Sequence, residues 1–546
     1  MNTIWFIPIS VLIGAALFIV FINRGRPNIG AAWLAAIIAA LFAWGWTVSL
    51  YWRFDFLTGG ASLLSRGLTL FSPVPAAGLS GGVPVFILDR ISYPYMLAVV
   101  SLPLVLLLTA PSYMEPQSAP RLWFFYLLIE VIGFLTVSAN DISFIIYGWT
   151  IFDGIDLVVQ YLQARPEMIR RNFLTAIGIR FLGTILAASS LAFSTAFSVP
   201  ESRMFIIPSA AGFLLVACAL RMGIIPISQP YSDVSTSRVG LGTMLRLVSV
   251  LTVMPVLSRI PMMEMSLHML TVLSVFGAFA SLTGAVGWLL SENAAAGNTY
   301  AVLSICGMAF VSALSGEQSA LIAWGISVVL TCGPLSLYQI HNRFMNVLAG
   351  LLTAAFSGLP YTPNAVGWAG LVRAPYSLKD LLFILVMLVL MCGAFTHILR
   401  AEGRKFTDLE PWMRSVYPLG FVVSIAAHVF IGMVCFDQQF SMGVPAASVP
   451  AFAGAVAGAV LLNRLPERVR TQNLVAWGRE SVSFFWRMMT RLLDMEWLIR
   501  SGTWGLRLVR RLAAEISAVL ENNGGLVWEL LLMALLVAAA YSGTVP

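Results

Sequence analysis

The sequence predicts an all-α polytopic membrane protein with about sixteen transmembrane helices, some of them discontinuous, and a C-terminal lateral amphipathic helix. The first observation is composition: 59% of the 546 residues are hydrophobic, 10% are charged, and the mean hydropathy is +0.87. Soluble globular proteins are roughly 45–50% apolar and about 25% charged, so that class is excluded. The second observation is the number of apolar stretches close to the roughly 20 residues that cross a bilayer.

The bounds of the predicted apolar spans are given to within a few residues. The first has no basic region before it and no small-residue cleavage site, so we expect a retained span rather than a signal peptide. The predicted spans are 4–23, 30–51, 84–110, 121–138, 142–162, 173–197, 206–224, 239–259, 266–290, 299–314, 318–339, 344–371, 379–399, 414–436, 445–463 and 525–541.

The distribution of arginine and lysine predicts the orientation, with the N-terminus outside a bacterial inner (plasma) membrane. Alternating loops from that start place more basic residues inside than outside, as the positive-inside rule requires. The net charge of +7 is therefore a topology signal, and no nucleic-acid partner is expected. The inside loops hold Arg24, Arg26, Arg121, Arg165, Arg170, Arg171, Arg238, Arg343, Arg400, Arg404, Lys405 and Arg414. The outside loops hold Arg53, Arg66, Arg203, Arg259, Arg373 and Lys379.

The stretch from Cys218 to Arg246 is apolar but interrupted by Pro226 and Pro230. Proline breaks the hydrogen-bond ladder of a helix. Irregular backbone at membrane depth is tolerated only inside protein or beside a watered cavity, and in transporters it marks the ion path. The ion-path candidates here are Arg221, Asp233 and Arg246.

Four more ion-path candidates are three carboxylates in the spans at 121–138 and 142–162, and Arg180 in the span at 173–197. Glu130 lies inside an apolar helix, where an ionisable group is a functional hypothesis by default. Asp153 and Asp156 are three residues apart and so share a helical face. They either relay a proton or pair with an arginine such as Arg180 of the next span, and the sequence leaves both alternatives open.

Other polar groups favour structural roles. The five cysteines, which have no paired spacing, are expected to be packed thiols. Asp89 and Arg90 are expected to form a local ion pair or an interfacial cap, Lys379 and Asp380 an interfacial pair, and His428 a hydrogen bond within the bundle. We see no catalytic site, metal site or cofactor motif, so any redox chemistry is expected from partner subunits.

From about residue 84 to 370 the chain resembles the antiporter-like subunits of respiratory complex I, which are related to Mrp-type cation antiporter and membrane-bound hydrogenase subunits. ANDISFIIYGW resembles the family's Asp-Asn-x-Leu…Gly-Trp-Glu motif, with Gly148 and Trp149 matching. Arg180 falls at the arginine of an Asn-Arg-x-Gly-Asp pattern. The spacing of Arg221, Pro226 and Asp233 resembles the family's Lys-x4-Leu-Pro…Pro-Asp run.

Several positions where the family carries proton-relay groups differ in this chain. Thr150 stands at the relay glutamate, Arg221 at the pumping lysine and Arg246 at a relay histidine. Ala295 falls in the family's charged triplet, and Trp368 at its terminal lysine or glutamate. Burial can lower the pKa of a lysine until it exchanges a proton near neutrality, whereas arginine stays charged.

Charged and apolar residues interleave from about 466 to 523. This composition predicts an amphipathic helix along the inner membrane face, or an amphipathic linker that touches lipid only. The resemblance implies a distal-type subunit whose lateral helix contacts other membrane-arm subunits. The expected divisions are 1–83 (hairpin and outside loop), 84–371 (antiporter-like core), 372–465 (C-terminal helices), 466–524 (lateral helix) and 525–546 (terminal anchor).

Three functions remain open. The first is an accessory membrane-arm subunit of a complex I-like assembly (NADH:quinone oxidoreductase or related) with impaired or absent proton translocation of its own. The second is an active proton or cation translocator that uses rewired carboxylates, with arginines as fixed countercharges. The third is a stand-alone secondary transporter, against which the long lateral helix argues.

Overall fold

The computed structural model describes residues 6–24, 28–57, 68–71, 86–113, 119–163, 167–196, 203–227, 240–262, 265–291, 294–359, 361–372, 375–400, 404–436, 448–464 and 525–542, with scattered positions between 504 and 515. The chain forms two compact units, Met1–Ser483 and Phe484–Pro546. The first contains nearly all the described helices, and the expected divisions at 83/84, 371/372 and 465/466 lie within it.

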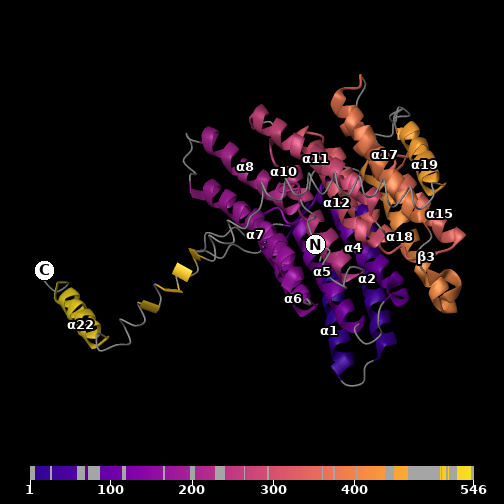
Figure 1. The fold of residues 1–546 in the computed structure, drawn as a ribbon. Coiled ribbons are helices and arrows are strands. Elements are labelled where there is room, and N and C mark those ends of the chain that lie inside the picture. Colours follow the sequence, from indigo (N-terminus) through magenta and orange to yellow (C-terminus); the bar gives the residue numbers. More distant parts are fainter. Residues whose placement is uncertain are drawn as a thin grey trace. The chain divides into compact units, whose positions relative to one another are not determined.

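The first unit is a bundle of helices (Figure 1). Its first half contains α1 (Phe6–Arg24), α2 (Ile29–Leu57), α4 (Ser92–Thr109), η2 (Ala110–Ser112), α5 (Ala119–Ser138), α6 (Ile142–Gln163), α7 (Glu167–Ala196), α8 (Arg203–Arg221), α9 (Leu241–Leu251) and α10 (Met254–Arg259). Its second half contains α11 (Leu267–Leu290), α12 (Ala294–Leu314), α13 (Gln318–Leu330), α14 (Cys332–Ser336), α15 (Arg343–Phe356), α16 (Pro363–Leu371), α17 (Leu378–Leu399), η4 (Phe406–Asp408), α18 (Pro411–Cys435) and α19 (Ser448–Arg464).

Two short strand pairs accompany the helices. Strands β1 (Leu68–Phe71) and β2 (Phe86–Leu88) are antiparallel, with Leu68 opposite Leu88. Strands β3 (Ile340–His341) and β4 (Arg404–Lys405) are parallel. The span expected at 84–110 therefore begins as a strand and becomes helical only at Ser92.

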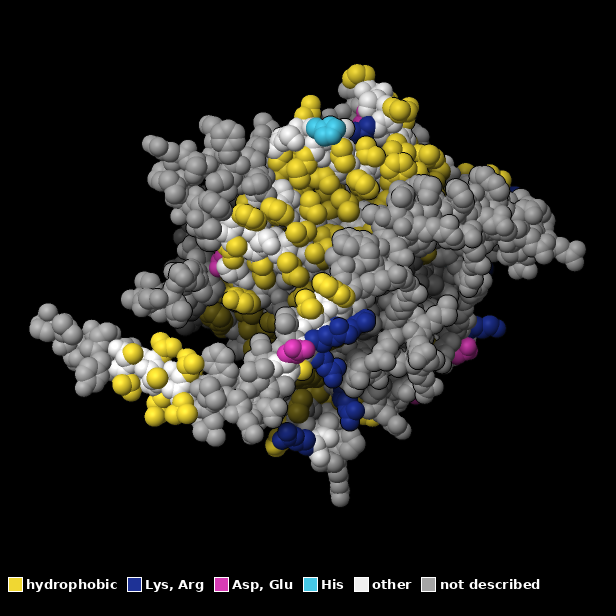
Figure 2. All heavy atoms as spheres, turned by 60° about the vertical axis from the view of Figure 1, so that its left-hand side comes forward, with side chains coloured by type: hydrophobic (Ala, Val, Ile, Leu, Met, Phe, Trp, Pro, Cys, Tyr) yellow, Lys and Arg dark blue, Asp and Glu magenta, His cyan; other side chains and the backbone are white. Residues whose placement is uncertain are grey.

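Twelve helical segments of the described chain are long and apolar enough to cross a membrane. The predicted all-α multi-pass class is confirmed, while the described residues do not establish the count of sixteen. Apolar side chains cover a broad area of the face in Figure 2. Along α11 the exposed large apolar side chains are Leu267, Val272, Val275 and Phe279. In lipid, such a surface carries no hydration cost, which explains why these helices are apolar on all sides.

Helices α4, α12 and α13 form the interior of the bundle. Every residue of α4 is buried, as is every residue of α13 from Ala320 to Leu330. Because every backbone group of a helix bonds within the helix, such segments are buried without unpaired amides. The more polar and interrupted helices α6 to α9 pack beside this interior and supply the candidate site.

The break expected between Cys218 and Arg246 is present. Helix α8 ends at Arg221, and Gly223 follows with φ 74°. The Gly223 amide donates to the Leu220 carbonyl (3.2 Å) and the Ile224 amide to the Ala219 carbonyl (2.9 Å), the pattern of a Schellman C-cap. Arg221 therefore lies in the last turn, where the helix dipole favours a cation. Pro226 follows in a turn, and Pro230 and Asp233 lie outside the described residues.

A second break corrects the expectation of one continuous span at 344–371. Helix α15 ends at Phe356 and α16 begins at Pro363. Gly358 (φ 88°) and Tyr361 (φ 65°) both adopt the left-handed region between them. Pro363 at the first position of α16 is compatible with a helix start but not with continuation of α15. Hydropathy could not predict this break, because the hydropathy of an apolar residue is the same whether the chain continues as a helix or turns at that residue.

The expected interfacial pairs are only partly correct. Asp89 caps α4 by accepting from the Ser92 amide at 2.6 Å, but its ion pair is with Arg259 (3.3 Å), not the neighbouring Arg90. Asp380 forms a capping box with Ser377 at the start of α17, and Lys379 donates to Ser315 at 3.0 Å. The ion-pair partner of Asp89 and the hydroxyl that accepts from Lys379 therefore lie on other segments of the chain, whereas Asp380 bonds to Ser377 three residues before it.

Helices α11 and α12 cross at very close range. Ser281 and Ser304 exchange hydrogen bonds with each other's carbonyl groups at 3.0 and 2.8 Å. A Cβ placed on Gly284 would lie 2.5 Å from the Ser304 nitrogen and 2.6 Å from the Tyr300 carbonyl oxygen. Backbone atoms cannot move aside as a side-chain end can, so this crossing requires glycine.

We therefore expect Gly284→Ala to destabilise the protein by about 1–3 kcal/mol or more, the usual cost of an overpacked core. The measurement is the apparent Tm of the purified protein in detergent. Gly14→Ala on α1 is the matched control, because a Cβ there meets nothing within 4 Å. Equal Tm values for the two variants would contradict the close crossing.

The second unit contains α22 (Gly525–Ser542), at the position of the predicted terminal anchor. Its described side chains from Leu530 to Val537 are apolar and exposed. Most of the predicted lateral helix at 466–524 lies outside the described residues, so that element remains a prediction.

Candidate functional site

Three helices supply a buried cluster of charged side chains. Helix α6 supplies Asp153 and Asp156, α7 supplies Arg180, and α8 supplies Arg221. All four residues are at least 95% buried, and Arg221 is only 1% exposed. The structure thus brings together four of the seven ion-path candidates, including the Asp–Arg180 pairing that the sequence left open.

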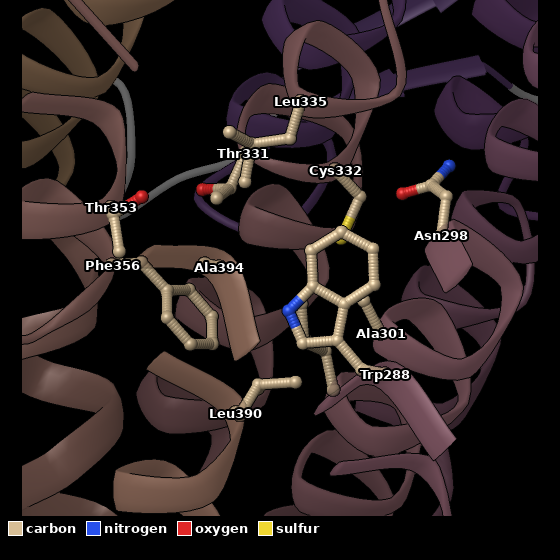
Figure 3. Close-up of a pocket in the computed structure, with 11 residues that line it drawn as sticks. Trp288, Asn298, Ala301, Thr331, Cys332, Leu335, Thr353, Phe356, Leu390 and Ala394 are labelled. Carbon is tan, nitrogen blue, oxygen red and sulfur yellow. The ribbon is translucent and has the colours of Figure 1, made fainter. Parts of the chain in front are cut away.

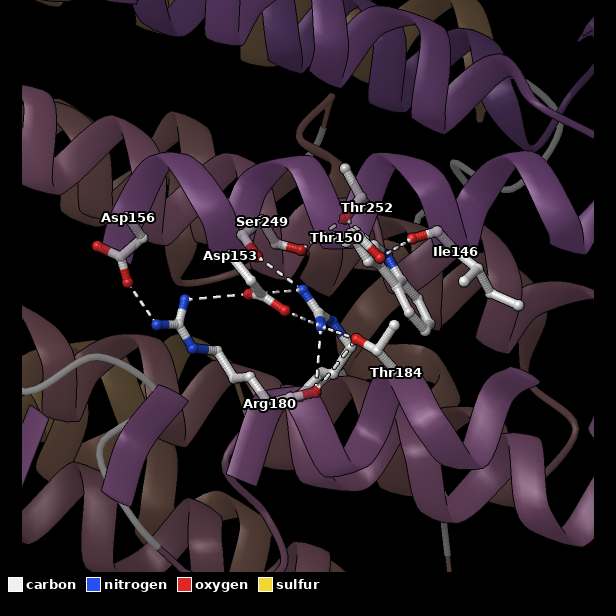
Figure 4. A network of polar contacts seen from close by, with 10 residues as sticks. Ile146, Thr150, Asp153, Asp156, Arg180, Thr184, Ser249 and Thr252 are labelled. Carbon is white, nitrogen blue, oxygen red and sulfur yellow. Dashed lines mark hydrogen bonds and ion pairs between the residues drawn. The ribbon is translucent and has the colours of Figure 1, made fainter. Parts of the chain in front are cut away.

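Arg221 binds Asp153, which is labelled in Figure 4, with both ends of its guanidinium group. Nη1 lies 2.8 Å from Oδ2, and Nη2 lies 3.2 Å from Oδ1. Two parallel bonds of this kind fix the orientation of both groups and are stronger than bonds between neutral groups. Nη1 also donates to the Thr184 hydroxyl at 2.7 Å and to the Arg180 carbonyl at 3.3 Å.

Arg180 connects the two aspartates. Its Nη2 donates to Oδ2 of Asp156, while its Nη1 lies 3.4 Å from Oδ1 of Asp153. The residues are three apart on α6, so a single guanidinium group can reach both carboxylates. The cluster contains two acidic and two basic side chains and is neutral as a whole, which is the condition for burying charge in lipid at tolerable cost.

Neighbouring residues fit closely around Arg221. Its guanidinium carbon lies 4.7 Å from the ring centre of Trp149, a cation–π contact. The Trp149 indole nitrogen in turn donates to Thr252 at 3.1 Å. A Cβ on Gly183 would lie 2.9 Å from the Cγ of Arg221, so glycine allows α7 and α8 to approach here. These contacts hold the arginine in one orientation.

Thr150, which the sequence resemblance aligned with a relay glutamate, does not face this cluster. It is exposed, and its hydroxyl donates to the Ile146 carbonyl of its own helix at 2.8 Å. Asp153 lies three residues further along α6, nearly one helical turn, and makes the contact with Arg221. A carboxylate is therefore present opposite Arg221, nearly one helical turn from Thr150. The substitution of a relay glutamate by Thr150 stays a prediction.

The other candidates lie elsewhere. Glu130 on α5 is completely buried, and neither of its carboxyl oxygens has a hydrogen-bond partner in the described part of the chain. Arg246 is buried on α9, outside the cluster. Trp368 is buried on α16 and packs against Gly358 at the second break. Asp233 and the side chain of Ala295 are outside the described residues.

The sequence analysis missed the polar neighbours Thr184 and Ser249. Ser249 lies 3.5 Å from Nη2 of Arg221. Thr184 follows Arg180 by four residues, and this spacing on one face of α7 was the available signal. Ser249 gave no such signal, because hydroxyl groups are common in apolar spans and usually bond to their own helix. The residues described contain no group of His, Cys, Asp or Glu that could hold a metal ion.

No protein-family model and no curated protein sequence matches this chain. Solved structures do match. A chain of respiratory complex I from Thermus thermophilus, solved with bound NADH, superposes with a TM-score of 0.60 at 17% identity, covering 83% of this chain and 99% of that chain. The chain has the fold of the antiporter-like membrane subunits of complex I.

A second match extends the antiporter-like fold to nearly the whole chain. A chain of the membrane-bound sulfane sulfur reductase, an archaeal respiratory membrane complex, superposes with a TM-score of 0.62 at 13% identity, covering 97% of this chain and 99% of that chain. At such low identity the likeness establishes the fold, and the chemistry must be argued from this chain's own residues.

Proposed function

We propose that this chain is an accessory membrane-arm subunit of a complex I-like respiratory assembly, in which the antiporter-like fold is kept and the subunit's own proton translocation is impaired or absent. The antiporter-like fold and the two respiratory complexes that share it support membership of such an assembly. The closed Asp–Arg cluster carries the proposal that this subunit is accessory.

The cluster contains no group suited to pass a proton onward. Guanidinium groups stay charged at any ordinary pH. Asp153 accepts two bonds from Arg221 and lies beside Arg180, so a proton added to it would leave a net positive charge in a buried cluster. Such an uncompensated charge costs several kcal/mol. The arrangement therefore favours a fixed electrostatic clamp between α6, α7 and α8.

The test removes the clamp without changing net charge. In the assembled host complex, reconstituted in liposomes, we expect Asp153→Asn with Arg221→Met to leave the number of protons moved per turnover unchanged. Asp89→Asn with Arg259→Met is the matched control, because that ion pair lies outside the cluster and is partly exposed. A selective fall in protons per turnover for the cluster variant, with intact assembly, would reject the accessory role.

One observation favours the alternative of an active translocator. The buried, unpaired carboxyl group of Glu130 is the only ion-path candidate that the described structure leaves without a hydrogen bond or ion pair. If the subunit translocates protons through rewired carboxylates, Glu130→Gln should give a large deficit in the same measurement. The accessory role predicts none.

Two further proposals, on the partner subunits and on the orientation, follow from the assignment to a complex I-like assembly. We propose that neighbouring membrane-arm subunits contact the predicted lateral helix at 466–524, and that the N-terminus faces the outside of a bacterial inner membrane. Support comes from the excess of arginine in the predicted inside loops. A stand-alone transporter is disfavoured because both solved neighbours are chains of respiratory membrane complexes.

A further inference from the structure

A large cavity lies at one end of the helix bundle of the first unit, outside the Asp–Arg cluster. Its walls come from the last turns of α10 and α12, the first turns of α11 and α13, and the short connections between them. The space open to the centre of a water-sized sphere is about 440 Å³. Small-molecule sites typically have about 300–1,000 Å³. The cavity shown in Figure 3, with Trp288, Asn298 and Thr331 in its walls, has about 20 Å³ by the same measure and is too small for an organic ligand.

The position of the large cavity places it at the edge of the membrane. Its four helices belong to segments that are long and apolar enough to cross a bilayer, namely Leu241–Arg259, Leu267–Leu290, Gly297–Leu314 and Gln318–Ser336. Such segments end where the hydrocarbon layer meets the lipid headgroups, so walls made from their ends lie at that boundary. The wall residue Leu267 is 80% exposed. The apolar wall therefore continues onto the outer surface of the bundle, where lipid lies.

The walls of this cavity combine two kinds of surface. Leu257 and Leu314 are buried apolar wall residues. Ser315 and Gln318, at the turn between α12 and α13, are exposed polar wall residues. An acyl chain is stabilised by apolar walls and a headgroup by polar ones. The combination therefore suits a molecule that has both parts.

A positive charge lies beside the polar wall. The ammonium group of Lys379, at the start of α17, donates to the Ser315 hydroxyl at 3.0 Å. Lysine has three N–H donors, and in the part of the chain that the structure describes Lys379 forms no ion pair. The Glu317 side chain of the same turn does not line the cavity. A lysine is a point charge well suited to a phosphate group, so the charge here complements a phosphate.

We propose that this cavity binds a phospholipid, with an acyl chain against Leu257, Leu270 and Leu314 and the phosphate group beside Lys379. A lipid fits better than a water-soluble ligand because the apolar wall reaches the lipid-facing surface and the charge lies at headgroup depth. The bound lipid bridges the ends of α10 to α13 and the start of α17. This role is the same whether or not the subunit moves protons.

Photo-crosslinking in vesicles tests the site. The assembled host complex is reconstituted in phosphatidylcholine vesicles that contain a trace of phosphatidylglycerol with a photoreactive group on one acyl chain. After illumination we expect adducts on Leu257 or Leu314, which surrounding lipid does not reach because both side chains are buried. Met254 is the matched control position, because it is also buried but does not line the cavity, and we expect no adduct there.

Two variants test the two parts of the site. Leu270→Trp fills the cavity and should abolish the adducts on Leu257 and Leu314, whereas Val275→Trp, on the same helix but outside the cavity walls, should keep them. Lys379→Ala should lower the ratio of adducts formed by photoreactive phosphatidylglycerol to those formed by photoreactive diacylglycerol, which has no phosphate. We expect a fall of about fivefold, because one basic group near an anionic membrane surface contributes about 1 kcal/mol. The exposed Lys405 is the control, and Lys405→Ala should leave the ratio unchanged.

Three results would overturn the proposal. The first is a wild-type complex that gives adducts on exposed side chains such as Phe279 but none on Leu257 or Leu314, as a cavity filled by a partner subunit would. The second is an equal yield on these two residues in Leu270→Trp and wild type. The third is an equal lipid ratio in Lys379→Ala and wild type, which would reject the phosphate beside Lys379. The wild-type measurement decides whether lipid enters the cavity even if a variant fails to assemble.

Discussion

Replacing Arg221 with methionine is expected to destabilise the protein by about 3–5 kcal/mol, the usual effect of removing one partner from a buried ion pair. Asp153 would lose the bidentate contact at 2.8 and 3.2 Å, and Thr184 would lose a donor at 2.7 Å. The measurements are the apparent Tm in detergent and the fraction of the subunit that assembles with its partners.

The double variant Asp153→Asn with Arg221→Met distinguishes the stability lost by breaking the ion pair from the stability lost by removing side-chain packing. It removes both charges, so we expect it to recover a large part of the stability lost by Arg221→Met alone. Arg259→Met is the single-site control, because its pair with Asp89 is partly exposed and should cost far less. If Arg221→Met and Arg259→Met lower the apparent Tm equally, the buried ion pair does not stabilise the protein more than an exposed one, and the proposed clamp is wrong.

Replacing both Asp153 and Asp156 with asparagine is expected to have the largest effect. Arg180 and Arg221, each at most 2% exposed, would then lose every ion pair described for them. Removing one partner from a buried ion pair costs on the order of 3–5 kcal/mol, and because Arg180 contacts both aspartates the two losses will not simply add. We expect the subunit to fail to accumulate in the membrane, as measured by immunoblot of membrane fractions.

The matched control loses the same two negative charges at the surface. Asp408 and Glu410 are exposed in the connection before α18, so Asp408→Asn with Glu410→Gln should accumulate normally. A further variant that adds Arg180→Met and Arg221→Met to the two asparagines should recover accumulation. Normal levels of the double-asparagine variant would mean that water or another group compensates the arginines, which the clamp does not allow.

Much of the fold followed from the sequence because membrane insertion depends on local composition. Long apolar stretches predicted the helices, and Pro226 with the charged residues around it predicted the interruption after Arg221. The second break, between Phe356 and Pro363, was missed as an interruption of its span because its residues are mostly apolar. Hydropathy reports how a residue partitions between water and lipid, and that property is the same on either side of a chain reversal.

The site was only partly predictable. The three-residue spacing of Asp153 and Asp156 predicted a shared face, and Arg180 was named as a partner. Comparison by position alone treated Thr150 as a lost carboxylate, whereas the structure shows Asp153 opposite Arg221. Thr150 is exposed and Asp153 is buried although they are only three residues apart, and which of them faces Arg221 depends on how α6 is oriented in the bundle.

The sequence by itself determined that this chain is a multi-pass helical membrane protein and that it is interrupted after Arg221; that its arginines stand at proton-exchanging positions of the family stays a prediction. Only the tertiary structure decided which charges meet. It joined Arg221 to Asp153 across α8 and α6, left Glu130 without a partner in the described chain, and placed Asn298 beside a cavity. The physical reason is that insertion into lipid depends on each segment alone, whereas pairing of buried charges depends on which helix faces are brought together.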